Sequence, residues 1–349
     1  MAKTLSNKRT SAYKPWLAWY CGFALLWTLF LLYAGGFTTS IHAGMAFLDW
    51  PLSHGSVNPE GWMADRDMRA EHGHRLLGAK VGLLMLGLFA WLWLREERRW
   101  VRRLGAAAVV MVVVQGLLGG FRVLFDELNI ATDSNVVAQT FAVMHACLGQ
   151  IFLCLLVTIA VVCSRPWIEN KAGLRAPVEA STRWWGVAAC AAIGLQLVIG
   201  AVMRHNHAAL AIPTFPWSSP YNTVLPLSWT FPVSIHFAHR AGAIVVTVCL
   251  LVFAWKLWRS RATGPNFLTG SVAITAFLGV QIFLGALTVL TLKNEYVATL
   301  HMLLGAFLLA LTWMLTFVCY RLPLEQTAAA PADRLPVPSP ESSGGAARA

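Results

Sequence analysis

Apolar residues occur along the chain in long runs that are separated by short polar stretches. Each run has roughly the 20 residues that a helix needs to cross the ~30 Å hydrocarbon core of a bilayer. The pattern predicts an all-α polytopic membrane protein with eight transmembrane helices, near residues 16–38, 70–94, 104–124, 139–163, 184–203, 233–255, 266–290 and 296–319.

Composition supports this interpretation. Of the 349 residues, 57% are hydrophobic and only 12% are charged, and the mean hydropathy is +0.59. A soluble domain of this size would need far more charged side chains to cover its surface. The seven cysteines fall in or at the ends of the predicted helices, so we expect small packing residues rather than disulfides.

The net charge of +11 is distributed in an alternating way. Basic residues precede the first run and follow the second, fourth, sixth and eighth. The other connecting segments have few cations, and they hold Asp49, Asp65, Asp67, Asp126, Glu127 and Asp133. Because basic loops remain in the cytoplasm, we expect both termini to be cytoplasmic. The charge is therefore a topology signal in a lipid bilayer and not the sign of a nucleic-acid partner. No signal or transit peptide is evident, which favours a bacterial cell inner membrane.

The two halves of the chain repeat one another. "EHGHR" opens the second run and "HFAHR" the sixth, while "VVVQGLLGG" in the third run resembles "LGVQIFLGA" in the seventh. The fourth and eighth runs each contain a histidine with a glycine four residues later. We therefore expect two pseudo-symmetric four-helix bundles in the same orientation. Their predicted bounds are 1–163 and 184–320, with a cytoplasmic linker at 164–183 and a Pro/Ala/Ser-rich, disordered tail at 321–349.

One histidine lies on the second and one on the fourth helix of each half: His74 and His145, then His239 and His301. Each lies about five residues inside the outer end of its predicted helix, so all four share a similar depth. Two imidazoles that face each other across a four-helix bundle are the axial ligands expected of a six-coordinate haem. Zinc bound by His74, His145 and Glu71 is the weaker alternative, because no Cys ligand or HExxH motif accompanies them. Small residues one turn from each histidine leave room for a flat macrocycle: Gly78, Gly149, Gly242 and Gly305.

The halves differ three residues before the first histidine of each pair. The first half has Glu71 there and the second has His236. A carboxylate on the ligand's helix face suggests that only the first site performs chemistry, the alternative being a solvated side chain in the outer loop. Arg75 and Arg240 follow the histidines directly and either pair with porphyrin propionates or extend to the membrane surface.

Taken with their order and spacing, these motifs resemble the haem A synthase family of CtaA- and Cox15-like membrane enzymes. The resemblance covers almost the whole chain and includes "GGFTTSIHAGMAFLDWPLSHGSVNP", "EHGHR", "HACLG", "HFAHR" and "LHMLLG". It implies an oxidoreductase acting on CH or CH2 groups, which oxidises a porphyrin methyl of haem O to the formyl group of haem A. Haem O synthase and cytochrome oxidase assembly factors are the protein partners that it implies.

The resemblance also assigns residues. His239 and His301, with Arg240, would bind a resident haem b that relays electrons. His74 and His145, with Arg75, would bind the substrate haem, and Glu71 would be the catalytic carboxylate beside it.

Two departures from the family pattern matter. Residues 39–69 and 204–232 contain none of the cysteines that many members carry in their outer loops. Thr39 stands where an arginine commonly follows the Gly-Gly pair in the family, so a propionate contact assigned to that arginine is not carried over to this chain. Two rival functions also explain four histidines, namely a di-haem electron-transfer cytochrome of b561 type and a haem transporter. Glu71 and the Trp-Pro outer loop favour the synthase.

The charge pattern gives a first testable prediction. Reporter fusions at the C-terminus and near residue 97 should be active on the cytoplasmic side, and a fusion near residue 60 on the periplasmic side. The reason is that the basic loops resist translocation across the membrane. An inverted pattern of reporter activity would place the four histidines near the cytoplasmic surface and contradict the prediction.

Overall fold

The computed structural model describes residues 12–127, 135–169, 177–264 and 266–321. Residues 322–349, for which a disordered tail is expected, and residues 170–176 of the expected linker lie outside the described part. Within it, regular structure is helical, and pairing between extended segments is limited to one isolated bridge between Ser53 and Ser56.

Eight of the helices are long and apolar enough to cross a membrane. The protein is therefore a multi-pass membrane protein, as the hydropathy pattern predicts. In chain order the helices are α1 (Pro15–Ser40), α2 (Arg66–Arg95), α3 (Arg99–Glu127), α4 (Val136–Cys163), α6 (Ala180–His205), α7 (Phe231–Arg259), α8 (Asn266–Leu290) and α9 (Glu295–Cys319), with the short α5 (Arg165–Ile168) and the 3-10 turn η1 (Ala208–Leu210) between them.

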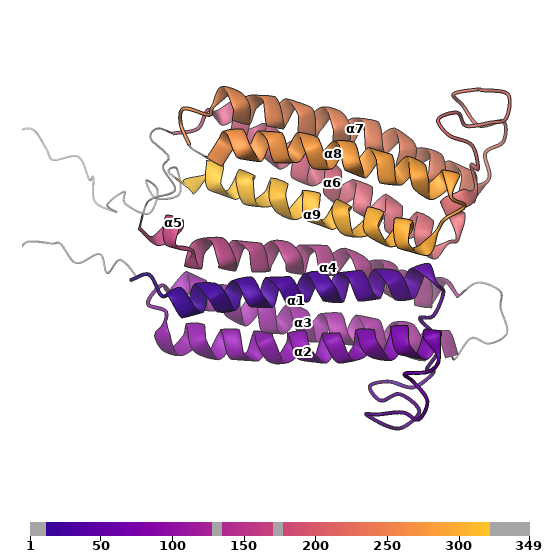
Figure 1. Cartoon of the computed structure of the whole chain (residues 1–349), viewed down its shortest axis with the longest axis horizontal. Coiled ribbons are helices and arrows are strands. Elements are labelled where there is room, and N and C mark those ends of the chain that lie inside the picture. The colour runs from indigo at the N-terminus through magenta and orange to yellow at the C-terminus, as the bar shows by residue number, and fades with distance from the viewer. Residues whose placement is uncertain (1–11, 128–134, 170–176, 265, 322–349) are drawn as a thin grey trace, which may run out of the picture.

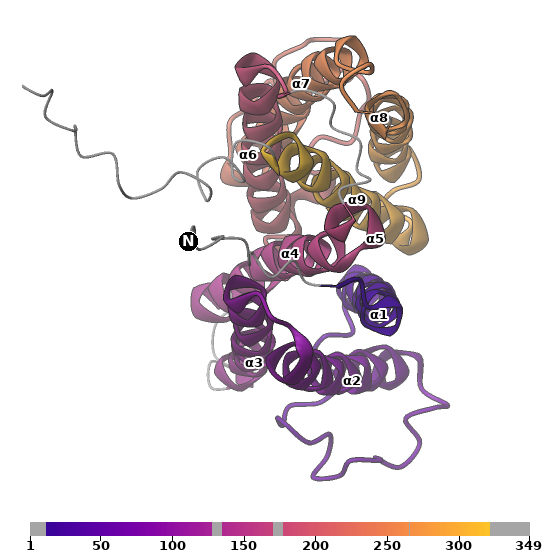
Figure 2. The ribbon, with the colours of Figure 1, turned by 90° about the vertical axis from the view of Figure 1, so that its left-hand side faces the viewer.

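The long helices pack in two groups of four (Figures 1 and 2). In the first group α1 contacts α2 and α4, and α3 contacts the same two helices, so α1 and α3 lie on opposite sides of the bundle. Helices α6 to α9 have the same arrangement, with α6 opposite α8. The two groups meet where α1 and α4 contact α9 and where α4 contacts α6. Helices α4 and α9 are the most buried spans: 61% and 50% of the residues in their most apolar segments are buried, against 17–22% for the other six spans.

The two described ends of the chain lie at the same end of the molecule, with α5 (Figure 1). The opposite end carries the two long connections, between α1 and α2 and between α6 and α7. We call the end with the two described chain ends and α5 the inner end, and the end with the two long connections the outer end.

Polar caps set where helices begin at the outer end. The Asp65 carboxylate accepts hydrogen bonds from the amides of Asp67 and Met68, and the Asn135 side chain accepts one from Ala138. Such caps satisfy amides that have no partner within the helix. Helices α2 and α4 begin four and three residues before the predicted apolar runs, and α7 and α9 begin two and one residues before them, so the four histidines lie six to nine residues inside their helices. The expected depth of five residues was too shallow.

The apolar cores of the two groups fill mainly their inner halves. The core of the first group is built around Leu17, Met85 and Ile159, and that of the second around Phe253, Leu257 and Phe267, all nearly inaccessible to solvent. A smaller cluster between α4 and α9 joins them. In the outer half of each bundle, glycine, histidine and glutamine line the interior in place of large apolar side chains. The outer half is therefore the part of the interior that can hold a functional site.

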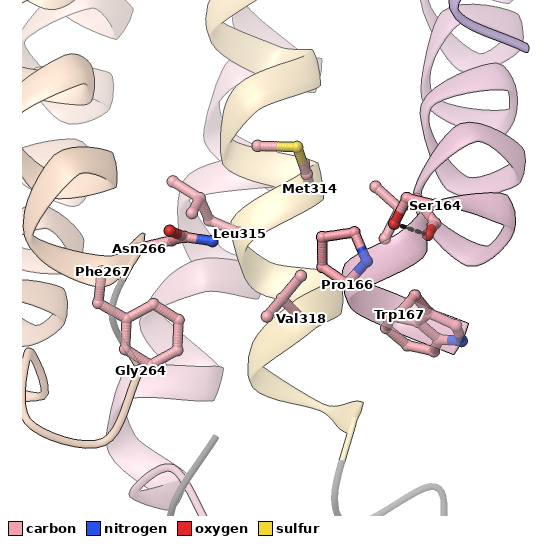
Figure 3. Close-up of a pocket in the computed structure, with 10 residues that line it drawn as sticks. Ser164, Pro166, Trp167, Gly264, Asn266, Phe267, Met314, Leu315 and Val318 are labelled. Atoms are coloured by element: carbon pink, nitrogen blue, oxygen red, sulfur yellow. Dashed lines mark hydrogen bonds between the residues drawn. The ribbon is translucent and has the colours of Figure 1, made fainter. Parts of the chain in front are cut away.

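An apolar pocket of about 160 Å³ lies at the inner end, between the α4–α5 corner, α9 and the start of α8 (Figure 3). Pro166, Trp167, Phe267 and Val318 line it, and the Ser164 hydroxyl beside it donates to its own helix at Val161 O, 2.6 Å away. The pocket lies at the end opposite the histidines and has no free ionisable group in its lining.

Candidate functional site

The four histidines form two pairs, one inside each bundle. The ring centroids of His74 on α2 and His145 on α4 are 6.3 Å apart, with an interplanar angle of 85°. Those of His239 on α7 and His301 on α9 are 6.4 Å apart, at 77°. Two imidazoles that share one metal ion at ~2 Å each have centroids roughly 6 Å apart, so both pairs have the spacing of a bis-histidine site.

Glycines on the two flanking helices make room for these rings. A Cβ atom on Gly35 of α1 would lie 2.6 Å from Cε1 of His74, and one on Gly119 of α3 would lie 3.2 Å from Cε1 of His145. In the second bundle, Gly200 of α6 and Gly285 of α8 have the same relation to His239 and His301, at 3.0 Å each. Each imidazole thus packs directly against a neighbouring backbone that has no side chain.

Several buried polar atoms beside the rings lack a hydrogen-bond partner. They are Nδ1 of His74 and His301 and the side-chain oxygens of Gln115, Gln196 and Gln281. Buried polar groups normally have partners, and an exception marks an absent ligand or water. Each of the three glutamines lies one turn inward of a glycine that contacts a ring, namely Gly119, Gly200 or Gly285. Their side chains reach the neighbouring helix at the glycine one turn inward of a histidine, so the orphaned oxygens lie just inside the level of the rings.

Two glutamines each donate a hydrogen bond to the backbone carbonyl of a paired histidine on the neighbouring helix. Gln115 Nε2 donates to the His145 carbonyl at 3.0 Å, and His145 Nδ1 lies 3.0 Å from the Gln115 carbonyl. Gln196 Nε2 donates to the His239 carbonyl at 2.7 Å and lies 3.0 Å from His239 Nδ1. These contacts orient the two rings with Nδ1 toward the neighbouring helix, which is how second-layer partners fix the ring nitrogen of a metal ligand.

Glu71 is buried, with 4% of its surface exposed, so the alternative of a solvated outer-loop side chain is wrong. One carboxylate oxygen accepts from Arg75 Nη2 at 2.6 Å, and the other accepts from the Phe47 amide at 3.2 Å. The Arg75 guanidinium also donates to the carbonyls of Phe47, Asp49 and Leu52. Glu71 and Arg75 together therefore fix the α1–α2 connection over the first bundle.

The second bundle repeats this arrangement with a different residue. His236 Nδ1 accepts from the Ile212 amide and its Nε2 accepts from Arg240 Nε, both at 3.2 Å. Arg240 donates further to the carbonyls of Ile212, Thr214 and Trp217. A single sequence offset relates each of these residues to its counterpart around Glu71 and Arg75, and the same offset relates the two cis prolines, Pro51 and Pro216.

The repeat therefore extends beyond the helical motifs that predict it and includes the outer loops. The signal was present as the Trp-Pro of the first loop and the Phe-Pro of the third. This signal was weak because the contacts that the two loops share are made by backbone carbonyls and amides, which any residue supplies.

The carboxylate of Asp49 shapes the tip of the first loop. Burial by itself would raise the pKa of Asp49, but the amides of Gly55 and His54 donate to it at 2.7 and 2.8 Å and bring the pKa below its usual range. Hydrogen bonds to the charged form of a carboxyl have this effect. The loop that covers the first bundle is thus held by two carboxylates, Glu71 at its base and Asp49 at its tip.

Two partly buried arginines near the rings were not among the residues expected from the sequence. Arg122 on α3 donates to the Gly44 carbonyl at 2.8 Å, and Arg204 on α6 donates to Gly36 O and, at 2.7 Å, to the hydroxyl of Ser40. Each lies one turn outward of a glycine that contacts a ring. That spacing, Gly119 to Arg122 and Gly200 to Arg204, is the sequence signal that could have identified them.

Residues 18–313 match the model of the COX15-CtaA family, described as cytochrome oxidase assembly protein. The chain belongs to this family. The resemblance drawn from the motifs is thereby confirmed, and it extends over all eight spans.

Several proteins that are similar to this chain carry the name "Heme A synthase". One, from Shouchella clausii (strain KSM-K16), is 30% identical over 307 residues, covering 86% of this chain and 93% of the relative. Another, from Lysinibacillus sphaericus (strain C3-41), is 23% identical over 312 residues, covering 88% and 95%. A third, from Geobacillus kaustophilus (strain HTA426), is 25% identical over 293 residues, covering 82% and 86%.

The residues present fit haem better than zinc. Haem iron needs only two axial ligands from the protein, and each bundle offers one histidine pair with the matching spacing, a glycine cradle and orphaned polar atoms. Zinc would need three or four protein ligands. In the described part of the chain, no group of three or more His, Cys, Asp or Glu side chains could hold a metal ion, and the seven cysteines are free.

The glycine cradle gives a prediction with an internal control. Gly285→Val should lower the amount of haem retained by the purified protein several-fold, because its side chain would occupy the space of the His301 ring. Haem per protein is measured from the absorbance of the pyridine adduct.

Gly279→Val on the same helix is the matched control, since a Cβ there meets no atom within 4 Å. Equal haem retention by the two variants would contradict the role given to Gly285.

Proposed function

We propose that this protein is a haem A synthase, which oxidises a methyl substituent of haem O to the formyl group of haem A. The single observation that carries the proposal is the pair of bis-histidine sites inside a chain of the COX15-CtaA family. The names of the relatives support it. No feature of the described residues favours the electron-transfer cytochrome or the transporter over it.

The second bundle is the site that we assign to a resident haem b. His239 and His301 would hold it, and its chemistry is the transfer of single electrons. The His236 side chain, which replaces Glu71 in this bundle, leaves no carboxylate beside the ring pair among the described residues. The site is therefore suited to redox transfer without proton abstraction.

The first bundle is the site that we assign to the substrate. His74 on α2 and His145 on α4 would hold haem O by its iron, inside the first bundle. Converting a methyl group to a formyl group with water as the oxygen source releases electrons and protons in equal number. A haem b held by the second bundle would pass the electrons on to an external electron acceptor, and the protons need a base within the first bundle.

Glu71 is the carboxylate available for that purpose. It lies on the helix face of His74, one turn toward the outer end, and it is shielded from solvent. Its two oxygens accept hydrogen bonds from Arg75 and Phe47 N, so it is held in one position. A fixed, desolvated carboxylate can orient a water molecule and accept its proton.

The setting of the reaction follows from the same assignments. We place the protein in a bacterial inner membrane with both termini in the cytoplasm and the two sites near the periplasmic surface. Haem O synthase would supply the substrate, and cytochrome oxidase assembly factors would receive the product.

The division of labour between the bundles predicts different effects of histidine loss. His239→Ala or His301→Ala should remove the resident haem b, whereas His74→Ala or His145→Ala should leave most of it bound, because each pair serves a separate macrocycle. Extraction of the purified variants and chromatography of their haems measures this.

His54→Ala in the exposed outer loop controls for the loss of an imidazole outside both pairs. Loss of all haem b from the His74 variant, in folded protein, would reverse the assignment of the bundles.

The role of Glu71 is tested by Glu71→Gln. The amide keeps the shape and can still accept from Arg75 or Phe47 N, so folding and haem b content should remain normal. Removal of the base should slow formation of haem A by about 10²–10⁴-fold, with haem O or a partly oxidised product accumulating. Chromatography of the extracted haems in a host that lacks its own synthase measures the product ratio. Haem A formation at the wild-type rate would reduce Glu71 to a clamp for the outer loop.

A further inference from the structure

The two bundles differ in where an arginine lies relative to the glycine cradle. In the first bundle, Arg122 lies one turn outward of Gly119 on α3. In the second, Arg204 lies one turn outward of Gly200 on α6. Residues three or four apart share a helix face, so both arginines lie on the face that contacts a histidine ring.

The repeat gives each arginine a counterpart in the other bundle, and both counterparts are threonines. Thr39 on α1 corresponds to Arg204 on α6, and Thr288 on α8 corresponds to Arg122 on α3. Each threonine hydroxyl donates to a carbonyl four residues earlier in its own helix, at 3.0 and 2.8 Å. Each bundle therefore has one arginine and one threonine at these positions, but the arginine has changed helix between the two.

Among the described residues, neither arginine forms an ion pair with a carboxylate, although Glu71 and Asp126 lie near enough to Arg122 to interact with its charge. Arg122 has one hydrogen bond in the described part, to Gly44 O, and Arg204 uses only its Nη2 atom, for Gly36 O and Ser40 Oγ. The ion pairs within the described residues involve other arginines. A guanidinium has five N–H donors in a planar fork that matches a carboxylate, and removing it from water without an anion is costly. Both positions thus have donors to spare for an acid.

Arg75 and Arg240, the arginines expected from the sequence to meet the porphyrin acids, are already occupied. Arg75 donates to three loop carbonyls and to Glu71, and Arg240 donates to three loop carbonyls and to His236. Both guanidiniums serve to hold the outer loops. Carboxylates of a ligand in either bundle would have to displace these bonds to reach them.

We propose that Arg122 and Arg204 each bind a carboxylate of the porphyrin held in the same bundle. The inference rests on the proposed function, because it takes a porphyrin acid as the ligand. Helix α3 lies across the first bundle from α1, and α6, the counterpart of α1, lies across the second from α8. The carboxylate-bearing edge is therefore drawn toward opposite sides of the two bundles. Arg122 acts in this way as a positioning residue that determines which edge of the substrate faces the rest of the first site.

The test compares a porphyrin acid with its ester. Full-length protein from a haem-deficient host is titrated with iron protoporphyrin IX and with its dimethyl ester, which keeps the metal and the ring but lacks the negative charges. A His301→Ala background isolates the first bundle, and a His74→Ala background isolates the second. Binding is followed by the absorbance of the ligated iron.

In the first bundle, the free acid should bind more tightly than the ester by roughly tenfold to a hundredfold, the range expected for hydrogen bonds to a charged group. Arg122→Gln should remove this preference, and Arg204→Gln should keep it. In the second bundle the effects of the two variants should be reversed. Arg66→Gln, which removes an exposed outer-end charge that pairs with Glu295, should keep the preference in both bundles.

Three results would overturn the proposal. If Arg122→Gln weakens acid and ester equally, its role is limited to holding Gly44 and the outer loop. If the variant keeps the full preference, the acid is bound elsewhere. If the wild-type protein binds neither porphyrin, the proposed function itself fails, and this outcome is distinct from the other two.

Discussion

The close approach of four imidazole rings to four bare stretches of backbone is the constraint on which the arrangement of this protein depends. A histidine ring that points into a helical bundle needs more width than the interior offers when every neighbour carries a side chain. Gly35, Gly119, Gly200 and Gly285 supply that width at the level of the rings, where a Cβ would lie 2.6 to 3.2 Å from Cε1 of the adjacent imidazole. Within each pair, the two rings are then separated by the distance expected of two ligands on one metal ion.

This arrangement divides each bundle into two functional halves. The inner half is packed with Leu, Ile, Met and Phe side chains that are almost completely buried, and it stabilises the fold. The outer half has orphaned glutamine and histidine atoms that an apolar core would not tolerate. The smaller apolar cluster between α4 and α9 joins the two bundles, and these two adjacent helices carry His145 and His301, one histidine of each pair.

The outer loops show how one scaffold supports two different sites. Glu71 and His236 make equivalent hydrogen bonds, to the amides of Phe47 and Ile212, and each accepts from the arginine of the following turn. Exchanging carboxylate for imidazole therefore leaves the loop in place while changing the chemistry beneath it. The exchange of arginine for threonine on the flanking helices likewise places the positive charge on opposite sides of the two bundles, at corresponding positions of the repeat.

The sequence by itself determined the eight spans, the helical class, the family and the pairing of histidines, because hydropathy and a repeated motif are local properties that survive in the linear order. It also showed Glu71 and His236 as the point of difference. The tertiary structure alone decided that Glu71 is buried and bound to a loop amide, and that Arg75 and Arg240 hold loop carbonyls. It also revealed Arg122 and Arg204, whose contacts to Gly44 and Ser40 join residues far apart in the chain. The physical reason is that backbone carbonyls and amides are present at every position, so the sequence carries no mark of which of them a buried side chain will reach.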